Sequence, residues 1–417
     1  MKKHAALVAG LTTAIVLQTA HAQSASASYR PDHVYIETNV KTPNGNAIAA
    51  FSRGYHGELT PIAGSPFSTG GAGTQYAGVN VGPQDSDQEI ISNPEHTLLF
   101  AVNSGSDSIA VFKIQNNGAL SPIPGSPFPS GGNDPVSLSL VGDTLFVVNK
   151  SGDLGRPTAI LPSYTALRVH SDGSLSSIGE STNDTSHEFQ DKVSVAIGSS
   201  PSQALVIPDT HLFFGTDFLT GLIERFKFDD NGKLHQLPPL ALPAREFTDT
   251  KTPRLPLGLW NHPYLPLVYV GFVSDNKVGV YEYDLEGSLK FRHAVPNSGA
   301  AVCWLRTNRA GTRLYTADTV TNSISVYDLG DPESPVQIQE LNLSGEGNVL
   351  QIALTPDDQS LYALSTRGEA TIPEGQGNEL HILTIQQNGK VDEIQSPVIF
   401  DEPNDTRPQG VAVVPGL

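Results

Sequence analysis

One phrase occurs twice in the first third of the chain. The stretches "ELTPIAGSPFSTGG" (58–71) and "ALSPIPGSPFPSGG" (119–132) agree at nine of fourteen positions and are offset by 61 residues. Self-similarity at a fixed spacing is typical of repeat folds, in which each repeat is one supersecondary unit. The phrase therefore indicates a chain built from recurring units.

The phrase is the end of a longer pattern of strands. In "TLLFAVNSGSDSIAVFKIQNNGALSPI" two apolar strands flank a polar gap, and an Asn-Gly turn leads to a third strand. Asn-Gly between strands is a strong hairpin signal. Seven such copies follow one another, and a short strand precedes every copy except the first. The unmatched strand is "RPQGVAVV" near the C-terminus. The sequence thus predicts an all-β, seven-bladed propeller with four antiparallel strands per blade, closed by its C-terminal strand.

The first 22 residues are predicted to be a secretory signal peptide. Lys2 and Lys3 precede the apolar stretch "AALVAGLTTAIVL", and "AHA" (20–22) resembles an A-x-A cleavage site. An uncleaved anchor helix is the alternative. We therefore expect residues 23–417 to form a single propeller domain in a periplasmic or secreted protein.

Charge and cysteine content exclude several classes of function. The net charge is −18, and loss of Lys2 and Lys3 would take it to −20. Such acidity argues against nucleic acid and anionic membranes as partners.

Cys303 is the only cysteine, so no intrachain disulfide or Cys₄ zinc site can form. It lies in the apolar stretch "AAVCWL", which favours a buried, unreactive thiol.

Loop lengths point to one face of the predicted ring. The turns between the first and second strands of each blade, and between the third and fourth, are short. The long segments lie on the opposite face and include 73–87, 150–163, 181–199 and 366–378. Long loops on a rigid scaffold usually carry binding and catalysis. We expect the functional site at the centre of this long-loop face.

Polar residues recur where the second strand of each blade ends on this face. Three residues after each Phe or Tyr of these strands stand Thr38, Asn103, Asn149, Asp217, Phe272, Asp318 and Ser365. Strand interiors disfavour Asn and Asp. These side chains either line a polar pocket or cap strand ends through Asx-type turns.

The long loops add charged candidates. Five arginines could gather around a carboxylate or phosphate, or could simply keep the loops soluble: Arg156, Arg245, Arg254, Arg367 and Arg407. "SHEFQD" places His187 beside acidic residues that could hold a metal, although surface loops often carry such residues by chance. No Walker A, G-x-G-x-x-G, G-x-S-x-G or H-E-x-x-H motif occurs. We therefore predict no cofactor and no bound metal.

The repeat "LFAVNSGSDSIAVFKIQNNGALSPIPGSPF", with "RLYTADTVTNSISVYDL", resembles the lactonase family of seven-bladed propellers. That family includes 6-phosphogluconolactonases and 3-carboxy-cis,cis-muconate lactonizing enzymes. The resemblance covers essentially the whole predicted mature chain and implies a lactone hydrolase or cycloisomerase. It is less specific for activity than for fold, because propellers host many functions.

The catalytic pattern that the resemblance implies is incomplete. The family places a His after Pro on one inner strand, an Arg after Pro on a later one, and a Glu at the end of the following strand. Ser202 stands at the His position, Ala301 at the Arg position, and Asp318 at the Glu position. No nearby His or Arg is expected to take over on either inner strand.

Two functions remain open from the sequence. The first is an exported lactonase-like hydrolase that acts on a small polar lactone or sugar acid as a monomer. Its base would be Asp318 or Asp217, and its substrate would contact Asn103, Asn149, Ser202, Arg254, Arg367, Arg407 and His187. The second is a non-catalytic propeller that binds a ligand or protein on the same face. Two ionisable groups within hydrogen-bond reach at the channel would favour the enzyme.

Overall fold

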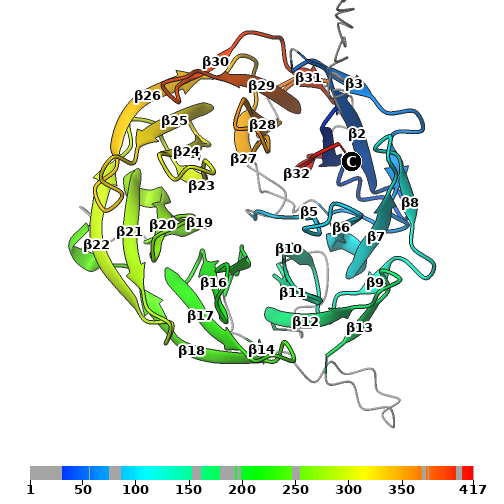
Figure 1. Cartoon of the computed structure of the whole chain (residues 1–417), viewed down its shortest axis with the longest axis horizontal. Coiled ribbons are helices and arrows are strands. Elements are labelled where there is room, and N and C mark those ends of the chain that lie inside the picture. Colours follow the sequence, from blue (N-terminus) through cyan, green and yellow to red (C-terminus); the bar gives the residue numbers. More distant parts are fainter. Residues whose placement is uncertain are drawn as a thin grey trace, which may run out of the picture.

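The structure is a computed structural model that describes residues 31–55, 57–74, 86–152, 161–178, 193–194, 199–246, 254–368, 372–373, 375–400 and 406–416. Seven antiparallel sheets surround a central axis as blades (Figure 1). The predicted signal peptide lies outside the described residues and stays a prediction. Among the helices described, none has the length and apolar character needed to cross a membrane.

Each sheet supplies one blade, and its strands are given from the axis outward. Blade 1 contains β32 (Gln409–Val414), β1 (His33–Glu37), β2 (Ala47–Arg53), β3 (Leu59–Pro61) and β4 (Phe67–Ser68). Blade 2 contains β5 (Ile90–Ser92), β6 (Leu98–Asn103), β7 (Ser108–Ile114), β8 (Leu120–Pro122) and β9 (Phe128–Pro129). Blade 3 contains β10 (Pro135–Val141), β11 (Thr144–Asn149), β12 (Ser163–Val169), β13 (Leu175–Ser177) and β14 (Val193–Ser194). Blade 4 contains β15 (Leu205–Val206), β16 (Leu212–Asp217), β17 (Leu222–Phe228) and β18 (Leu234–Ala241).

The remaining three blades follow the same order. Blade 5 contains β19 (Pro256–Asn261), β20 (Leu267–Phe272), β21 (Lys277–Tyr283) and β22 (Leu289–Pro296). Blade 6 contains β23 (Val302–Thr307), β24 (Arg313–Asp318), β25 (Ser323–Asp328) and β26 (Val336–Asn342). Blade 7 contains β27 (Asn348–Leu354), β28 (Ser360–Thr366), β29 (Glu379–Ile385), β30 (Val391–Glu393) and β31 (Val398–Ile399). Three short 3₁₀ helices complete the described elements: Ser104–Ser106, Ala244–Glu246 and Val273–Asp275.

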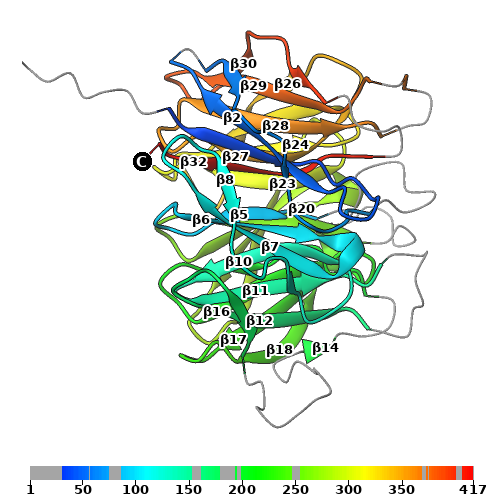
Figure 2. The same ribbon diagram turned by 90° about the vertical axis from the view of Figure 1, so that its right-hand side faces the viewer.

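The C-terminal strand closes the ring, as the sequence predicts. Strand β32 pairs antiparallel with β1, from His33 opposite Val414 to Glu37 opposite Gln409. The two ends of the propeller thereby share one blade, and the seven sheets stack around the axis in the side view (Figure 2). Closure satisfies the inner edge of β1, which would otherwise present unpaired backbone groups.

The repeated phrase forms the outer strands of blades 1 and 2. In each blade the outer strand is split in two, and the gap is bridged by a serine hydroxyl. The backbone N–H of Ala50 donates to Ser65 Oγ at 2.8 Å, and that of Val111 donates to Ser126 Oγ at the same distance. The Ser-Pro-Phe phrase is therefore repeated because it completes a backbone ladder twice, as expected for packing and turn chemistry.

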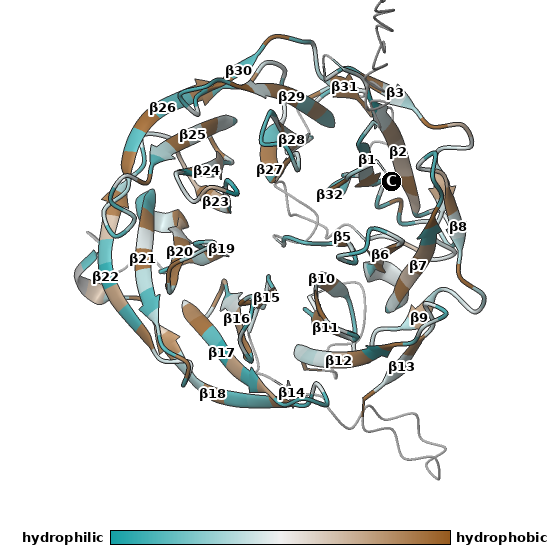
Figure 3. Ribbon diagram, in the orientation of Figure 1, coloured by the Kyte–Doolittle hydropathy of each residue, from teal (hydrophilic) through white to brown (hydrophobic). Residues whose placement is uncertain are grey.

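The hydrophobic core is distributed over the contacts between blades. The buried apolar residues form seven clusters, each mainly between two neighbouring blades. In the cluster between blades 3 and 4, Phe146 and Phe213 stack with their ring centres 5.4 Å apart. Because both faces of a blade pack against neighbours, strands such as β11 are buried along their whole length, and hydrophobic stretches appear in all blades (Figure 3). Cys303 is buried in the cluster between blades 6 and 7.

Candidate functional site

The seven predicted strand-end positions lie at or next to the ends of the second strands, and all are buried. Their exposed fractions range from 0 to 3%. Five of them are the last residues of β6, β11, β16, β20 and β24. Ser365 is the next-to-last residue of β28, and Thr38 directly follows β1. The strands are second from the axis, so most of these side chains contact neighbouring strands and crossovers of the ring.

Asp318 is held by two side chains of blade 6 and by Asn297 of the crossover from blade 5 to blade 6. Its Oδ1 accepts hydrogen bonds from Asn297 Nδ2 and Thr316 Oγ1, both at 2.9 Å, and its Oδ2 accepts one from Ser325 Oγ at 2.6 Å. Burial raises the pKa of Asp318 to about 7, although the three hydrogen bonds act in the opposite direction. The carboxyl group thus joins two strands of blade 6 to the preceding crossover, and its catalytic role stays a prediction.

We expect Asp318→Asn to remove part of the pH dependence of stability. Because the folded-state pKa of Asp318 lies above the ordinary value of 3.8, folding favours the protonated form. This contribution to stability is full at low pH and is lost as pH rises from about 4 to about 7, by at most about 4 kcal/mol. The variant stays neutral, so it should gain stability over the wild type between about pH 4 and pH 8 in urea unfolding. Equal pH profiles of the two proteins would contradict this expectation.

Asp217 caps the end of β16. Its Oδ1 accepts hydrogen bonds from the backbone N–H groups of Ser200 at 2.8 Å and Thr220 at 3.3 Å. These are the contacts that the strand-capping alternative predicts. Its Oδ2 is buried and has no hydrogen-bond partner among the residues that the structure describes.

The predicted amide and hydroxyl ligands also lie inside the blades. Asn103 Oδ1 accepts hydrogen bonds from Thr69 Oγ1 at 2.6 Å and Asn46 Nδ2 at 2.9 Å. Asn149 Nδ2 donates to Thr165 Oγ1 at 3.1 Å. Ser202 Oγ lies 2.9 Å from Thr216 Oγ1. All three predicted residues are fully buried.

The predicted loop residues are spread over separate loops and crossovers. Arg367 Nε donates to the carbonyl of Ile372 at 2.6 Å, within the long loop of blade 7. Arg407 is 7% exposed, and its carbonyl accepts a hydrogen bond from Asn39. Arg254 lies half-buried just before β19. His187 and Arg156, and the side chain of Arg245, lie outside the described residues.

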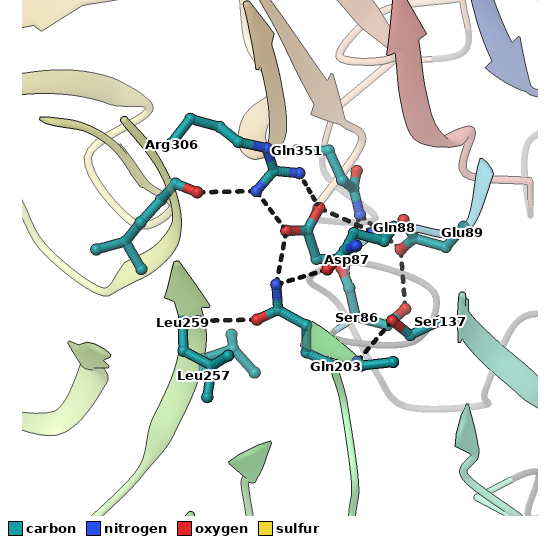
Figure 4. A network of polar contacts seen from close by, with 12 residues as sticks. Ser86, Asp87, Gln88, Glu89, Ser137, Gln203, Leu257, Leu259, Arg306 and Gln351 are labelled. Carbon is teal, nitrogen blue, oxygen red and sulfur yellow. Dashed lines mark hydrogen bonds and ion pairs between the residues drawn. The ribbon is translucent and has the colours of Figure 1, made fainter. Parts of the chain in front are cut away.

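A polar network crosses the centre of the ring (Figure 4). We call it the central network: Ser86, Asp87, Gln88, Glu89, Gln203, Arg306 and Gln351. The segment 86–89 precedes β5 and contacts the inner strands or inner segments of blades 3, 4, 6 and 7. The backbone N–H of Leu138 donates to the carbonyl of Gln88 at 2.9 Å, which anchors this segment to β10.

Arg306 and Asp87 form the ion pair of the central network. Nη1 and Nη2 of Arg306 donate to the two carboxylate oxygens of Asp87 at 2.6 and 2.8 Å. The guanidinium carbon also lies 4.1 Å from the ring centre of Trp260. The Asp87 side chain is 2% exposed and that of Arg306 is 12% exposed. A bidentate pair stacked on an aromatic ring fixes the guanidinium group and leaves part of it accessible.

Amide groups complete the surroundings of Asp87. Gln203 Nε2 donates to Asp87 Oδ2 at 3.3 Å and to Gln88 Oε1 at 3.0 Å, while Gln203 Oε1 accepts from the backbone N–H of Leu259 at 2.8 Å. The backbone N–H of Gln88 donates to Asp87 Oδ1 at 2.9 Å. Asp87 therefore receives four hydrogen bonds, of which the bond from Gln203 is the longest.

Glu89 is the second buried carboxyl group of the central network. Its Oε1 accepts hydrogen bonds from Ser86 Oγ at 2.8 Å and Gln351 Nε2 at 2.9 Å. Burial, and next the charge of Asp87, raise the pKa of Glu89 to about 8. Within the described residues, its Oε2 has no hydrogen-bond partner.

Sequence reasoning missed the central network. It also expected that no arginine of the inner strand after Ala301 would take part in the site. Arg306 lies on β23, five residues after Ala301, and its side chain reaches the centre of the ring. An arginine is thus present on that inner strand, although displaced from the expected position. The segment 73–87 was expected to matter as a long crossover, but nothing in its sequence indicated that its last residues would lie at the axis.

Blade 7 contains a buried series of a serine, a histidine and a glutamate. Ser365 Oγ lies 3.0 Å from His381 Nε2, and His381 Nδ1 lies 2.6 Å from Glu393 Oε1. Ser365 and His381 are 0% exposed, so a substrate has no access to the hydroxyl group. Glu393 Oε2 also accepts a hydrogen bond from the backbone N–H of Ser344 at 2.7 Å. Through Glu393 and Ser344, this series connects blade 7 to the crossover from blade 6. The Asp318 contacts connect blade 6 to the crossover from blade 5 in the same way.

Comparisons with known proteins support the fold. No protein-family model matches the sequence, and no curated protein matches it. Among solved structures, a "putative 6-phosphogluconolactonase" from Bacteroides uniformis aligns with a TM-score of 0.66 at 15% identity, covering 91% of this chain and 100% of that one. The periplasmic gluconolactonase PpgL of Pseudomonas aeruginosa aligns with a TM-score of 0.63 at 16% identity, covering 90% and 99%. The chain is therefore similar in fold to lactonase-family propellers.

Proposed function

We propose that the protein is a lactonase-type hydrolase that acts on a small polar lactone at the centre of the ring. The ion pair of Arg306 with Asp87 carries this proposal, because it places two ionisable groups in contact on the axis, with part of the arginine accessible. Lactone hydrolysis needs a cation near the carbonyl oxygen and a group that takes a proton from water. The similarity in fold to lactonase-family propellers supports the same class of reaction.

In the proposed reaction, Arg306 stabilises the negative charge that develops on the lactone carbonyl oxygen. Water attacks the carbonyl carbon and gives its proton to Asp87 Oδ2, where it replaces the long hydrogen bond from Gln203. The ring C–O bond then breaks, and the leaving oxygen takes this proton. The product is a hydroxy acid, whose new carboxyl group releases the second proton of the water to solvent, and the resulting carboxylate faces Arg306. Asp318 and Asp217 keep the structural contacts described above.

We further propose that the protein works as a monomer in the periplasm or outside the cell. The predicted signal peptide supports export, and PpgL, with which the chain shares its fold, is described as periplasmic. Export also favours an unphosphorylated substrate over a phosphorylated metabolite of the cytosol.

The alternative is a propeller that binds a polar ligand without chemistry. One observation favours it: all four hydrogen bonds that Asp87 accepts come from the protein itself. A carboxylate has about four acceptor positions, so Asp87 has none open for a proton from water unless one of these hydrogen bonds breaks.

Acid release from a panel of sugar and muconate-type lactones distinguishes the two functions. The proposed hydrolase should open at least one of these lactones well above the rate without protein. If the folded protein opens none of them but calorimetry detects binding of a lactone or its hydroxy acid, the binding function replaces the enzyme.

A further inference from the structure

Four buried oxygen atoms near the closing strand have no hydrogen-bond partner in the described structure. They are Oε2 of Glu37, Oε2 of Glu89, Oε1 of Gln351 and Oε1 of Gln409. The four side chains belong to residues that are 0 to 2% exposed. Buried polar atoms are normally paired, and an unpaired one costs free energy. All four of these atoms are acceptors, so the missing partner is positively charged or a donor.

Hydrogen bonds connect these four side chains in pairs. Gln409 Nε2 donates to Glu37 Oε1 at 3.3 Å, and Gln351 Nε2 donates to Glu89 Oε1 at 2.9 Å. Each unpaired amide oxygen therefore belongs to an amide group that already contacts one of the two carboxyl groups. The two pairs are neighbours. Gly410, the residue after Gln409, packs so closely against Glu89 that a Cβ atom placed on it would lie 3.2 Å from Glu89 Cβ.

Among the described residues, no cationic side chain donates a hydrogen bond to Glu37 or Glu89. Besides the two glutamines, Glu37 accepts from Asn46 Nδ2 at 2.7 Å, and Glu89 accepts from Ser86 Oγ. Arg306 is committed to Asp87 by its bidentate contact. Two neighbouring buried carboxylates require protons or a cation.

We propose that Glu37, Glu89, Gln351 and Gln409 bind a calcium ion that fastens the closing strand β32 to blades 2 and 7. Carboxylate and amide oxygens are the ligands that Ca²⁺ prefers, and Ca²⁺ tolerates irregular geometry better than Mg²⁺ does. Two carboxylates balance its charge. In the described part of the chain, no three His, Cys, Asp or Glu side chains group around one point; here amides supply half of the ligands. The site goes beyond the proposed hydrolase and does not depend on it.

The position of the site suggests what the ion does. Glu37 and Gln409 lie opposite each other in blade 1, where β1 pairs with the C-terminal strand. Glu89 precedes β5 of blade 2, and Gln351 lies on β27 of blade 7. An ion shared by them would connect the last strand of the chain to both neighbouring blades. Because only the folded ring brings these residues together, calcium should stabilise the folded state by mass action.

The test begins with the purified protein after treatment with a chelator. Adding calcium chloride should raise the thermal unfolding midpoint by several degrees, and calorimetry should give about one calcium ion per chain. Magnesium chloride at matched ionic strength is the comparison. No calcium binding by the folded wild type, or an equal shift with magnesium, would overturn the proposal.

Variants locate the ion. Glu37→Gln and Glu89→Gln should each weaken calcium binding at least tenfold, whereas Glu346→Gln, at an exposed position, should not. If protons rather than calcium neutralise the carboxyl groups, both variants replace a neutral acid by a similar amide. They would then keep wild-type stability, and the wild type would not respond to calcium, which contradicts the proposal. The readout is calcium binding, so its result is independent of lactone hydrolysis.

Discussion

A chain that ends at Pro408 should yield little folded monomer. This truncation removes β32, the inner strand of blade 1 that pairs with β1 along its whole length. It also removes the buried side chains of Ala412 and Val414 from the contact between blades 1 and 2. The inner edge of β1 would then be an open strand edge, which is a template for aggregation. Size-exclusion chromatography and circular dichroism would measure the loss.

Two controls distinguish the loss of ring closure from the effect of a shorter chain. Removal of 415–417 alone leaves β32 intact and should preserve the monomer. A synthetic peptide of residues 406–417, added during refolding of the truncated chain, should restore some of it by pairing with β1. A truncated chain that remains a folded monomer with the wild-type unfolding midpoint would contradict the role of β32.

Asp87→Ala should destabilise the protein by about 3 kcal/mol or more, because it leaves the guanidinium group of Arg306 without its counter-ion at the centre of the ring. The segment 86–89 would also lose the contacts that the Asp87 carboxylate makes with Gln203 of blade 4 and Arg306 of blade 6. The ion pair is only 2% and 12% exposed on its two sides, so water replaces it poorly. Denaturant unfolding compares the variant with the wild type.

A double variant tests whether the missing counter-ion is the cause. Asp87→Asn with Arg306→Met removes both charges, so it should be more stable than Asp87→Ala with Arg306 intact. Arg292→Lys, which changes an exposed ion pair with Glu333, serves as the control and should change stability little. If Asp87→Ala behaves like this control, the ion pair does not hold the centre of the ring together.

The sequence predicted the repeats well because each blade is formed by residues that are close together in the chain. Hairpin turns, alternating strands and the unmatched C-terminal strand all lie within short stretches, and each has a recognisable residue pattern. The strand-end positions were also located correctly. Their surroundings were harder to predict, because Asp318 is held by residues such as Asn297 that come from a separate crossover.

The centre of the ring could not be predicted from local patterns. Asp87 and Arg306 are 219 residues apart in the sequence, and only closure of all seven blades brings them together. The segment 86–89 reads as the end of a polar loop, and Arg306 reads as the polar end of an apolar strand. Their contact depends on the number of blades and on the position of each inner strand around the axis.

The central claim is that any lactone chemistry takes place at Arg306 and not at the strand-end carboxyl groups. The most direct measurement is kcat/KM for Arg306→Met and Asp318→Asn, side by side with the wild type, on the best lactone of the panel. We predict a loss of about 100-fold or more for Arg306→Met, as for removal of a group that stabilises an oxyanion, and near wild-type activity for folded Asp318→Asn. Full activity of Arg306→Met, with activity abolished in folded Asp318→Asn, would contradict the claim and move the reaction to blade 6.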